Sequence, residues 1–398
     1  MTDRPTGARL LCSATVVVLF LLAPSLRAGD DWAWESYVVK DDLWLANSFH
    51  GQRQFTFRIG AGGAISELRD VHEKDQPLLS PSFKGEATDR IMQWTAWSDS
   101  LTHPVAALPK FEWRFNVTQG GTFAGEISPT ISVRKSADGK TLDVYSVPQD
   151  QWKSEQQPHM RGRFAALTRY AMDEAGVLKI RRVLCVGDVN LDGKPREGFE
   201  QFYLEAWTPF LRSPAAFDAL ALSIDPAGKP DLWYRAGQNL PAYPHLKVET
   251  TKGYAVVFNS TDPARHTAVA LVYGTKQIPA SPDSPRDALP NDYILNSMEW
   301  DNGIAVLPAL SLHDLKTGTI LDQTLYLVPR PAMDAEMAAL LGQLAKAPPA
   351  PAAYPPGAHF TGELSQIATT LKANLPQPGH RTDHLATIPP TEAAVHEK

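Results

Sequence analysis

Short segments in which polar and apolar residues alternate recur along most of this chain, and they constrain its fold more than any other feature. Residues 54–59 and 111–117 alternate strictly, as strands with one buried face do. Further candidate strands lie at 37–45, 63–70, 129–134, 141–147, 161–171, 177–187, 200–207, 217–225, 253–259, 266–273 and 319–328. No long helical pattern alternates with them, so the sequence predicts antiparallel hairpins and meanders rather than a parallel α/β sheet.

More than a dozen strands within about 300 residues predict an all-β domain over residues 29–332, built as a large two-sheet antiparallel β-sandwich, a supersandwich. Residues 333–346 are predicted to form one helix that docks on the sandwich, with Met337, Leu340, Leu341 and Leu344 on one stripe. Residues 347–398 are rich in Pro and Ala and then polar, which predicts a mostly disordered tail with one short helix near 361–373.

Residues 1–28 have the layout of a secretory signal peptide. Arg4 and Arg9 precede an apolar run, and Ala28 gives a plausible cleavage point, although Leu26 meets the small-residue rule poorly. The alternative is an uncleaved N-terminal anchor. The expected location is therefore periplasmic or secreted, with no membrane span after cleavage, because no other segment is apolar enough to cross a bilayer.

The composition of the mature chain argues against some partners and cofactors. Removing residues 1–28 takes away three Arg and one Asp, which moves the formal charge from −6 to about −8. An acidic exported protein is a poor candidate for nucleic-acid binding. Cys12 would leave with the signal, so Cys185 could form no intrachain disulfide and is predicted to be a buried, inert thiol.

One stretch resembles the opening of galactose-mutarotase-like sandwiches. Residues 55–59 form a strand, residues 62–70 a glycine turn and a second strand, and residues 76–79 end in Pro-Leu-Leu. The resemblance implies a β-sandwich of the group that includes sugar epimerases and domains of polysaccharide lyases and glycoside hydrolases. The catalytic His and Glu motifs of the epimerases have no recognisable counterpart here. The resemblance therefore implies a relative of the lyase or hydrolase kind, or a non-catalytic one.

Four segments combine aromatic, basic and titratable residues in ways that suit a sugar. In the first, Arg90 and Gln93 offer hydrogen-bond donors, while Trp94 and Trp97 could stack on a pyranose ring. The alternative interpretation is that both tryptophans belong to the core.

The second segment places His159, Arg161 and Arg163 on one face of a predicted strand. Two guanidinium groups beside an imidazole suit an anionic substrate, since arginine pairs readily with carboxylates. A solvated strand face is the alternative interpretation.

The third segment alternates Tyr203, Glu205 and Trp207 onto one face, and Glu205 could act as an acid or base. In the fourth, two prolines stiffen a loop that presents Tyr243 and His245 as a proton-transfer pair. A polar cluster between the sheets and a proline-rich turn are the respective alternatives.

Two further features have structural interpretations. Arg182 lies on an otherwise apolar strand face, so it needs a partner such as Glu205 or Asp188, or a place in a substrate groove. Asp188, Asn190 and Asp192 match the first half of a calcium loop, but Phe199 occupies the twelfth position. A hairpin loop is favoured over a structural Ca²⁺ site, and no other metal or cofactor is predicted.

These observations predict an exported enzyme that acts on an acidic polysaccharide or oligosaccharide by β-elimination. His159 or His245 would be the base and Tyr243 the acid, and Arg90, Arg161 or Arg163 would neutralise the substrate carboxylate. Two alternatives stay open. One is a glycoside hydrolase that pairs Glu205 with Glu299 or Asp301. The other is a non-catalytic carbohydrate-binding or envelope protein.

Overall fold

The computed structural model describes the chain over a set of ranges between residues 31 and 375. They are 31–39, 42–63, 65–72, 77–79, 82–83, 86–87, 93–95, 122–123, 126–127, 130–147, 162–190, 195–196, 199–207, 217–235, 245–247, 252–262, 264–275, 292–298, 303–307, 309–349 and 352–375.

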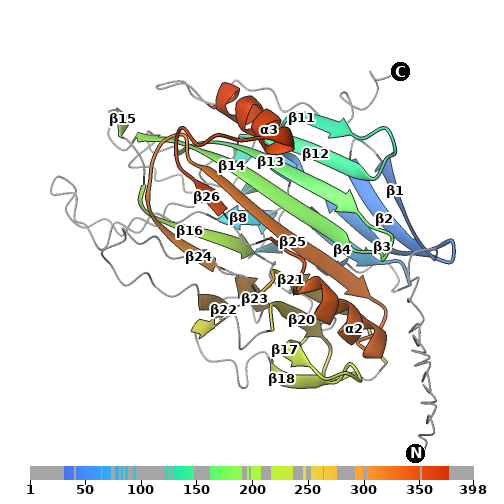
Figure 1. Ribbon diagram of the computed structural model, residues 1–398. Helices are drawn as coiled ribbons and strands as arrows, with labels where there is room; N and C mark the ends of the chain where they lie inside the picture. Colours follow the sequence, from blue (N-terminus) through green and yellow to red (C-terminus); the bar gives the residue numbers. More distant parts are fainter. Residues whose placement is uncertain are drawn as a thin grey trace, which may run out of the picture.

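Within the described ranges, the larger of two main sheets has 11 antiparallel strands, nine of them in the order β11-β12-β13-β14-β25-β21-β20-β17-β18 (Figure 1). Two short strands, β15 and β26, pair with β14 and β25. The bounds are β11 (Thr130–Lys135), β12 (Thr141–Ser146), β13 (Gly162–Met172), β14 (Leu178–Asn190), β15 (Pro195–Arg196), β17 (Ala219–Ile224), β18 (Pro230–Arg235), β20 (Tyr254–Phe258), β21 (Ala268–Val272), β25 (Ile320–Arg330) and β26 (Ala352–Tyr354).

The second main sheet is formed by the first five strands in sequential order. They are β1 (Trp32–Val39), β2 (Asp42–Phe49), β3 (Gln52–Ile59), β4 (Ile65–Asp70) and β5 (Pro77–Leu79), with the short 3-10 helix η1 (Ala61–Gly63) before β4. The single strand predicted at 37–45 is wrong, because the chain reverses between Val39 and Asp42, which face each other in the β1–β2 ladder. Three charged residues, 40–42, interrupt the apolar residues of this segment, and the prediction ran through the interruption.

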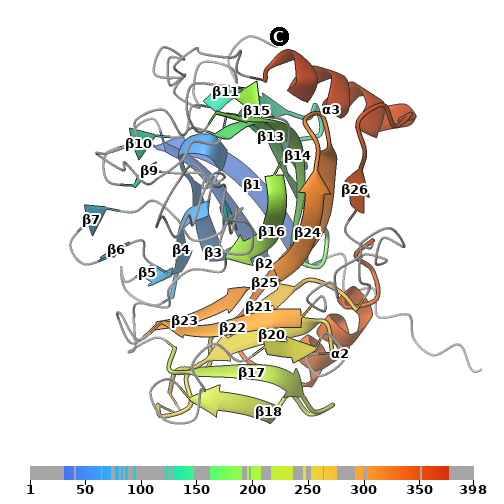
Figure 2. The same ribbon diagram turned by 90° about the vertical axis from the view of Figure 1, so that its left-hand side faces the viewer.

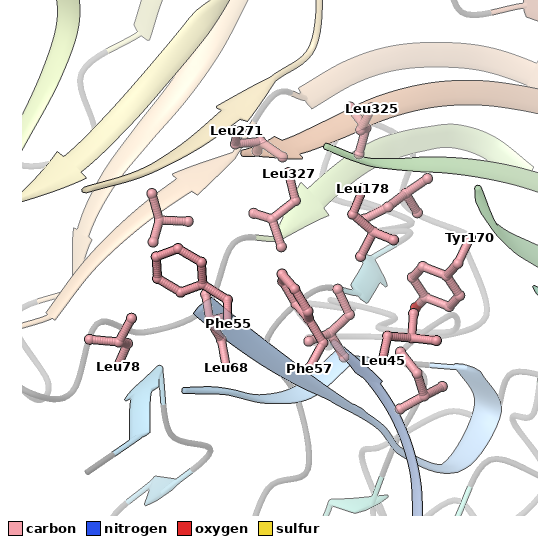
Figure 3. Close-up of a cluster of buried hydrophobic side chains, with 14 of the residues drawn as sticks. Leu45, Phe55, Phe57, Leu68, Leu78, Tyr170, Leu178, Leu271, Leu325 and Leu327 are labelled. Carbon is pink, nitrogen blue, oxygen red and sulfur yellow. The ribbon is translucent and has the colours of Figure 1, made fainter. Parts of the chain in front are cut away.

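Side chains from both sheets meet in the main hydrophobic core, as Figure 3 shows. Phe55 and Phe57 of β3 pack in one cluster with Tyr170 of β13, Leu178 of β14 and Leu325 of β25. All five are at most 1% exposed, and removing such side chains from water is the main force that holds two sheets together. The predicted two-sheet antiparallel sandwich is confirmed.

Several small sheets accompany the sandwich (Figure 2). Two of them have three strands each, in the orders β24-β16-β8 and β19-β22-β23, and two are short pairs, β6-β7 and β9-β10. The bounds are β6 (Ser82–Phe83), β7 (Glu86–Ala87), β8 (Gln93–Thr95), β9 (Thr122–Phe123), β10 (Glu126–Ile127), β16 (Phe199–Trp207), β19 (His245–Lys247), β22 (Asp292–Met298), β23 (Gly303–Leu307) and β24 (Ala309–Leu315).

The predicted docking helix is present as α2 (Ala335–Leu344). Asp334 caps it by accepting a hydrogen bond from the Met337 backbone N–H at 2.9 Å, which satisfies one of the free donors of the first turn. Met337 and Leu341 are buried in a second cluster with strand residues of β17, β20, β21 and β25. The helix therefore covers the outer face of the large sheet. No helix among the described residues is long and apolar enough to cross a membrane.

The C-terminal segment contains the short helix that the sequence predicts near residues 361–373. Strand β26 adds to β25, and the predicted short helix is present as α3 (Gly362–Ala373). Ile367, Ala368 and Leu371 of α3 pack on Leu167 and Cys185 of the large sheet. This segment is ordered because burying the apolar stripe of α3 offsets the loss of conformational entropy. Residues 376–398 lie outside the described part of the chain.

Cys185 is buried beneath α3, as the sequence predicts. Burial raises the pKa of its thiol to about 11. Because the thiolate is the reactive form, this cysteine is chemically inert at neutral pH.

Ionic contacts hold the first turn of α3 to the sheet. Arg169 forms a two-pronged pair with Asp143, with both N···O distances 2.6 Å, and Arg181 pairs with Asp322 at 2.7 Å. Glu363 of α3 accepts from both arginines, at 2.7 Å in the case of Arg181. Burial raises the pKa of Glu363, but the hydrogen bonds and charges of Arg169 and Arg181 outweigh that effect and lower the pKa overall.

We expect Glu363→Gln to lower the melting temperature slightly at neutral pH and not at acid pH. A carboxyl whose pKa is lowered in the folded state stabilises it above the unfolded pKa, and the contribution is lost as the pH falls through the folded pKa. Its side chain is 52% exposed, so the effect at neutral pH is at most about 1 kcal/mol.

Thermal unfolding of the parent and the variant between about pH 7 and pH 3 checks this expectation, because the gap between their melting temperatures should close towards pH 3. Glu174→Gln is the matched control, since Glu174 is 70% exposed and its carboxylate lies 3.4 Å from Lys140. A gap for Glu363→Gln that stays constant with pH would contradict the ionic origin of the effect.

Candidate functional site

The three-stranded sheet β24-β16-β8 brings together two of the four segments selected from the sequence. In the β16–β8 ladder Trp207 is opposite Gln93, Ala206 is opposite Trp94 and Glu205 is opposite Thr95. The first and third segments are therefore neighbours in one sheet although about a hundred residues separate them along the chain.

The fourth segment contributes β19, which starts at His245 and pairs with β22, where His245 is opposite Ile294. The sheet β19-β22-β23 contacts the sheet β24-β16-β8, since β23 approaches β16 and β22 approaches β24. Figure 2 shows β22 and β23 close to β24. The strand that begins at His245 thus belongs to a sheet adjacent to the one that carries Tyr203 and Glu205.

The second segment enters the large sheet at the start of β13, where Gly162 is opposite Val189 of β14. Arg163 and the pair Asp188 and Asn190 therefore lie at the same end of the large sheet. After Asn190 the chain turns back as β15, with Asn190 opposite Pro195. This is the hairpin that the sequence favours over a calcium loop. No cluster of three or more metal-ligating side chains occurs among the residues described, and a Ca²⁺ site that includes Asp192 stays a prediction.

The remaining candidates lie outside the described residues. They are Arg90, Trp97, His159, Arg161, Asp192 and Tyr243, together with Glu299 and Asp301 of the hydrolase alternative.

A row of buried polar residues crosses the inner face of the large sheet. Thr168, Arg182 and Gln323 are opposite one another on β13, β14 and β25, and they are 6%, 4% and 3% exposed. Their neighbours on the same face, including Ile180 and Leu325, belong to the main core. Burying three polar side chains in a row is costly unless they bind one another or a ligand.

Tyr170 is a partner that the structure assigns to Arg182. The two side chains are hydrogen-bonded, and the Tyr170 hydroxyl donates to the backbone carbonyl of Gly63. Burial raises the pKa of Tyr170 to about 12, although the charge of Arg182 acts against the rise. The phenol is therefore neutral at physiological pH, and the expected carboxylates Glu205 and Asp188 stay predictions as further partners.

The interior does not favour the charge of Arg182. Burial lowers the pKa of its guanidinium to about 10, even though Tyr170 raises it. A cation buried in the interior lowers the stability of the fold. Titratable groups with strongly shifted pKa values are common at functional sites, which makes Arg182 a candidate site residue.

Gln323 is the member of this row that the sequence analysis missed. It interrupts the apolar strand β25, and its Oε1 accepts no hydrogen bond in the described structure. An unsatisfied buried acceptor costs about 1–3 kcal/mol, so it marks a place for a water or a ligand group. A polar residue on the apolar face of a strand was the available signal, and the same signal selected Arg182.

Comparisons with known proteins give a resemblance in structure only. No protein-family model and no curated protein matches the chain. A galactose mutarotase-like protein from Clostridium acetobutylicum is similar over 75% of this chain and 98% of its own, at 12% identity and a TM-score of 0.31. Galactose 1-epimerase from Lactobacillus acidophilus is similar over 75% and 98%, at 10% identity and a TM-score of 0.29.

A copper-containing benzylamine oxidase from Hansenula polymorpha is similar to the same degree, over 77% of this chain and 62% of its own, at 10% identity and a TM-score of 0.32. At these values the likeness concerns the arrangement of strands, and no function of this chain is inferred from it.

Proposed function

We propose that this chain is an exported carbohydrate-active enzyme that cleaves an acidic polysaccharide by β-elimination. The observation that carries the proposal is the pairing of β8 with β16, which sets Gln93 and Trp94 next to the segment from Glu205 to Trp207. Aromatic rings, amides and carboxyl groups on neighbouring strands are the groups that bind a pyranose chain.

In the proposed reaction a base removes the C5 proton of a uronic acid unit. The electron pair forms the C4–C5 double bond, the bond from C4 to the glycosidic oxygen breaks, and an acid gives that oxygen a proton. His159 or His245 is the proposed base and Tyr243 the proposed acid. Arg90, Arg161 or Arg163 would neutralise the carboxylate, which stabilises the negative charge that develops when the proton leaves.

Export is proposed from the apolar segment within residues 1–28. A mature chain with a formal charge of about −8 is a poor general binder of nucleic acid, so the basic groups that would bind an anionic sugar have to be local to the site.

Incubating the purified chain with alginate, glucuronan, ulvan and pectate tests the proposal. We expect absorbance from the unsaturated product with at least one polymer, and we expect His245→Ala or Tyr243→Phe to reduce its rate at least about 100-fold. New reducing ends without this absorbance would favour hydrolysis by Glu205 with Glu299 or Asp301. Binding without any new reducing end would favour the non-catalytic alternative.

A further inference from the structure

Trp233 is the one large aromatic side chain that is strongly exposed in the part of the chain described, at 41%. It lies on β18, the edge strand of the large sheet. Leu232 and Tyr234 on the same strand pack against the main core, so Trp233 and Arg235 point to the outer face, because residues alternate along a strand.

Small side chains lie opposite Trp233 and Arg235 on the neighbouring strand β17. Ala221 is opposite Trp233 and Ala219 is opposite Arg235, and both alanines are completely buried. Phe258, which is opposite Ala219 on the far side, meets the indole at 6.0 Å between ring centroids and an angle of 63°. The ring of Trp233 is therefore held in place by an edge contact and still exposes a large apolar surface.

Hydrogen-bonding groups stand next to this ring. Arg235 Nε lies 3.5 Å from Asp218 Oδ2. The same oxygen accepts from the hydroxyls of Ser260, at 3.1 Å, and Thr261, at 2.9 Å. Ser260 and Thr261 are exposed, so a guanidinium, a carboxylate and two hydroxyls gather at Arg235, two residues along β18 from Trp233.

The charges around Trp233 cancel. Arg235 pairs with Asp218, and Lys252 lies 3.8 Å from Asp231 of the same strand. A balanced surface of this kind does not attract a polyanion such as a nucleic acid. Planar donors and acceptors beside a fixed aromatic ring suit a ligand with many hydroxyls and an apolar C–H face.

We infer that Trp233, Arg235 and Asp218 form a surface subsite for a pyranose unit of a polysaccharide chain. The C–H face of the sugar stacks on the indole, and its hydroxyls replace part of the hydrogen bonding between Asp218 and its neighbours. This subsite lies on the outer face of the large sheet, the face that α2 covers. Binding at this subsite requires no catalysis, and the inference does not depend on the proposed function.

Affinity electrophoresis of the full chain in gels that contain a neutral polysaccharide, xylan or β-glucan, tests the inference. We expect at least one polysaccharide to retard the parent and Trp233→Ala to weaken that binding about tenfold, the size expected for one stacking contact. Trp233→Phe should keep part of the affinity. Val71→Ala is the matched control, because Val71 is exposed to a similar extent, 46%, at another surface position, and it should bind as the parent does.

Two outcomes would overturn the inference. One is equal retardation of the parent and Trp233→Ala in every gel, or no retardation of the parent at all. The other is a lower molecular mass of Trp233→Ala in light scattering with unchanged retardation, which would make β18 an edge for self-association. Turnover of short uronic-acid oligomers, measured in parallel, should be unchanged in Trp233→Ala, so failure of the proposed enzyme and failure of this subsite give different results.

Discussion

Gly228→Ala is expected to lower the free energy of unfolding by about 3 kcal/mol or more, because two costs add. Gly228 closes the turn between β17 and β18 with a φ of +83°, a region that costs an L-residue roughly 1–2 kcal/mol. A Cβ at this position would also lie 2.2 Å from the backbone carbon of Asp334, the residue that caps α2. Backbone atoms cannot rotate away, so the helix itself would have to move.

Urea unfolding monitored by tryptophan fluorescence measures this loss. Gly357→Ala separates the two costs, since Gly357 has a φ of +85° and nothing within 4 Å of an added Cβ. It should lose only the roughly 1–2 kcal/mol of backbone strain. Equal losses for the two variants would show that α2 does not press on this turn.

Arg182→Met is expected to stabilise the fold and to lower the rate of turnover about 100-fold or more. The interior lowers the pKa of this guanidinium to about 10, so an apolar side chain of similar length should raise the free energy of unfolding by about 1–3 kcal/mol. The same change removes a cation from the inner face of the large sheet, where Gln323 also has an unsatisfied oxygen. Loss of a positioned charge in a water-poor site typically costs about 100-fold or more in rate.

The measurement combines urea unfolding with the rate of unsaturated-product formation on the polymer that the parent cleaves. Arg53→Met is the control, because Arg53 is 41% exposed on the second sheet, and it should change neither quantity appreciably. If Arg182→Met is destabilised and fully active, this arginine serves the fold alone. A stability gain with lost activity would identify it as a residue kept for function.

The strand content could be predicted from the sequence because alternating or continuous apolar runs between turn residues are local features. The patterns at 161–171, 177–187 and 319–328 correspond to β13, β14 and β25. The helical stripe that includes Met337 and Leu341 likewise predicted α2, since a period near 3.6 is equally visible in one dimension. The buried state of Cys185 followed from its place in an apolar strand.

The candidate site could be predicted less well than the strands, because the partners of its side chains lie on distant segments of the chain. Alternation showed that Arg182 would be on an apolar face, but Tyr170 as its partner depends on the register of β13 against β14. The sequence also selected Gln93 and Glu205 independently, and nothing in either segment indicates that β8 pairs with β16. The period of the side chains shows which face of a strand each residue lies on. The register of that strand and the identity of its neighbouring strand depend on contacts between distant residues.

The sequence by itself determined an all-β sandwich with a docking helix, because burial periodicity is a local property of each segment. Only the tertiary structure decided three other matters: that residues 352–375 pack on the large sheet, that β8 and β16 are neighbours, and that a polar row crosses the inner face. Each of these depends on which apolar surfaces meet, and the free energy of such contacts is shared between segments far apart in the chain.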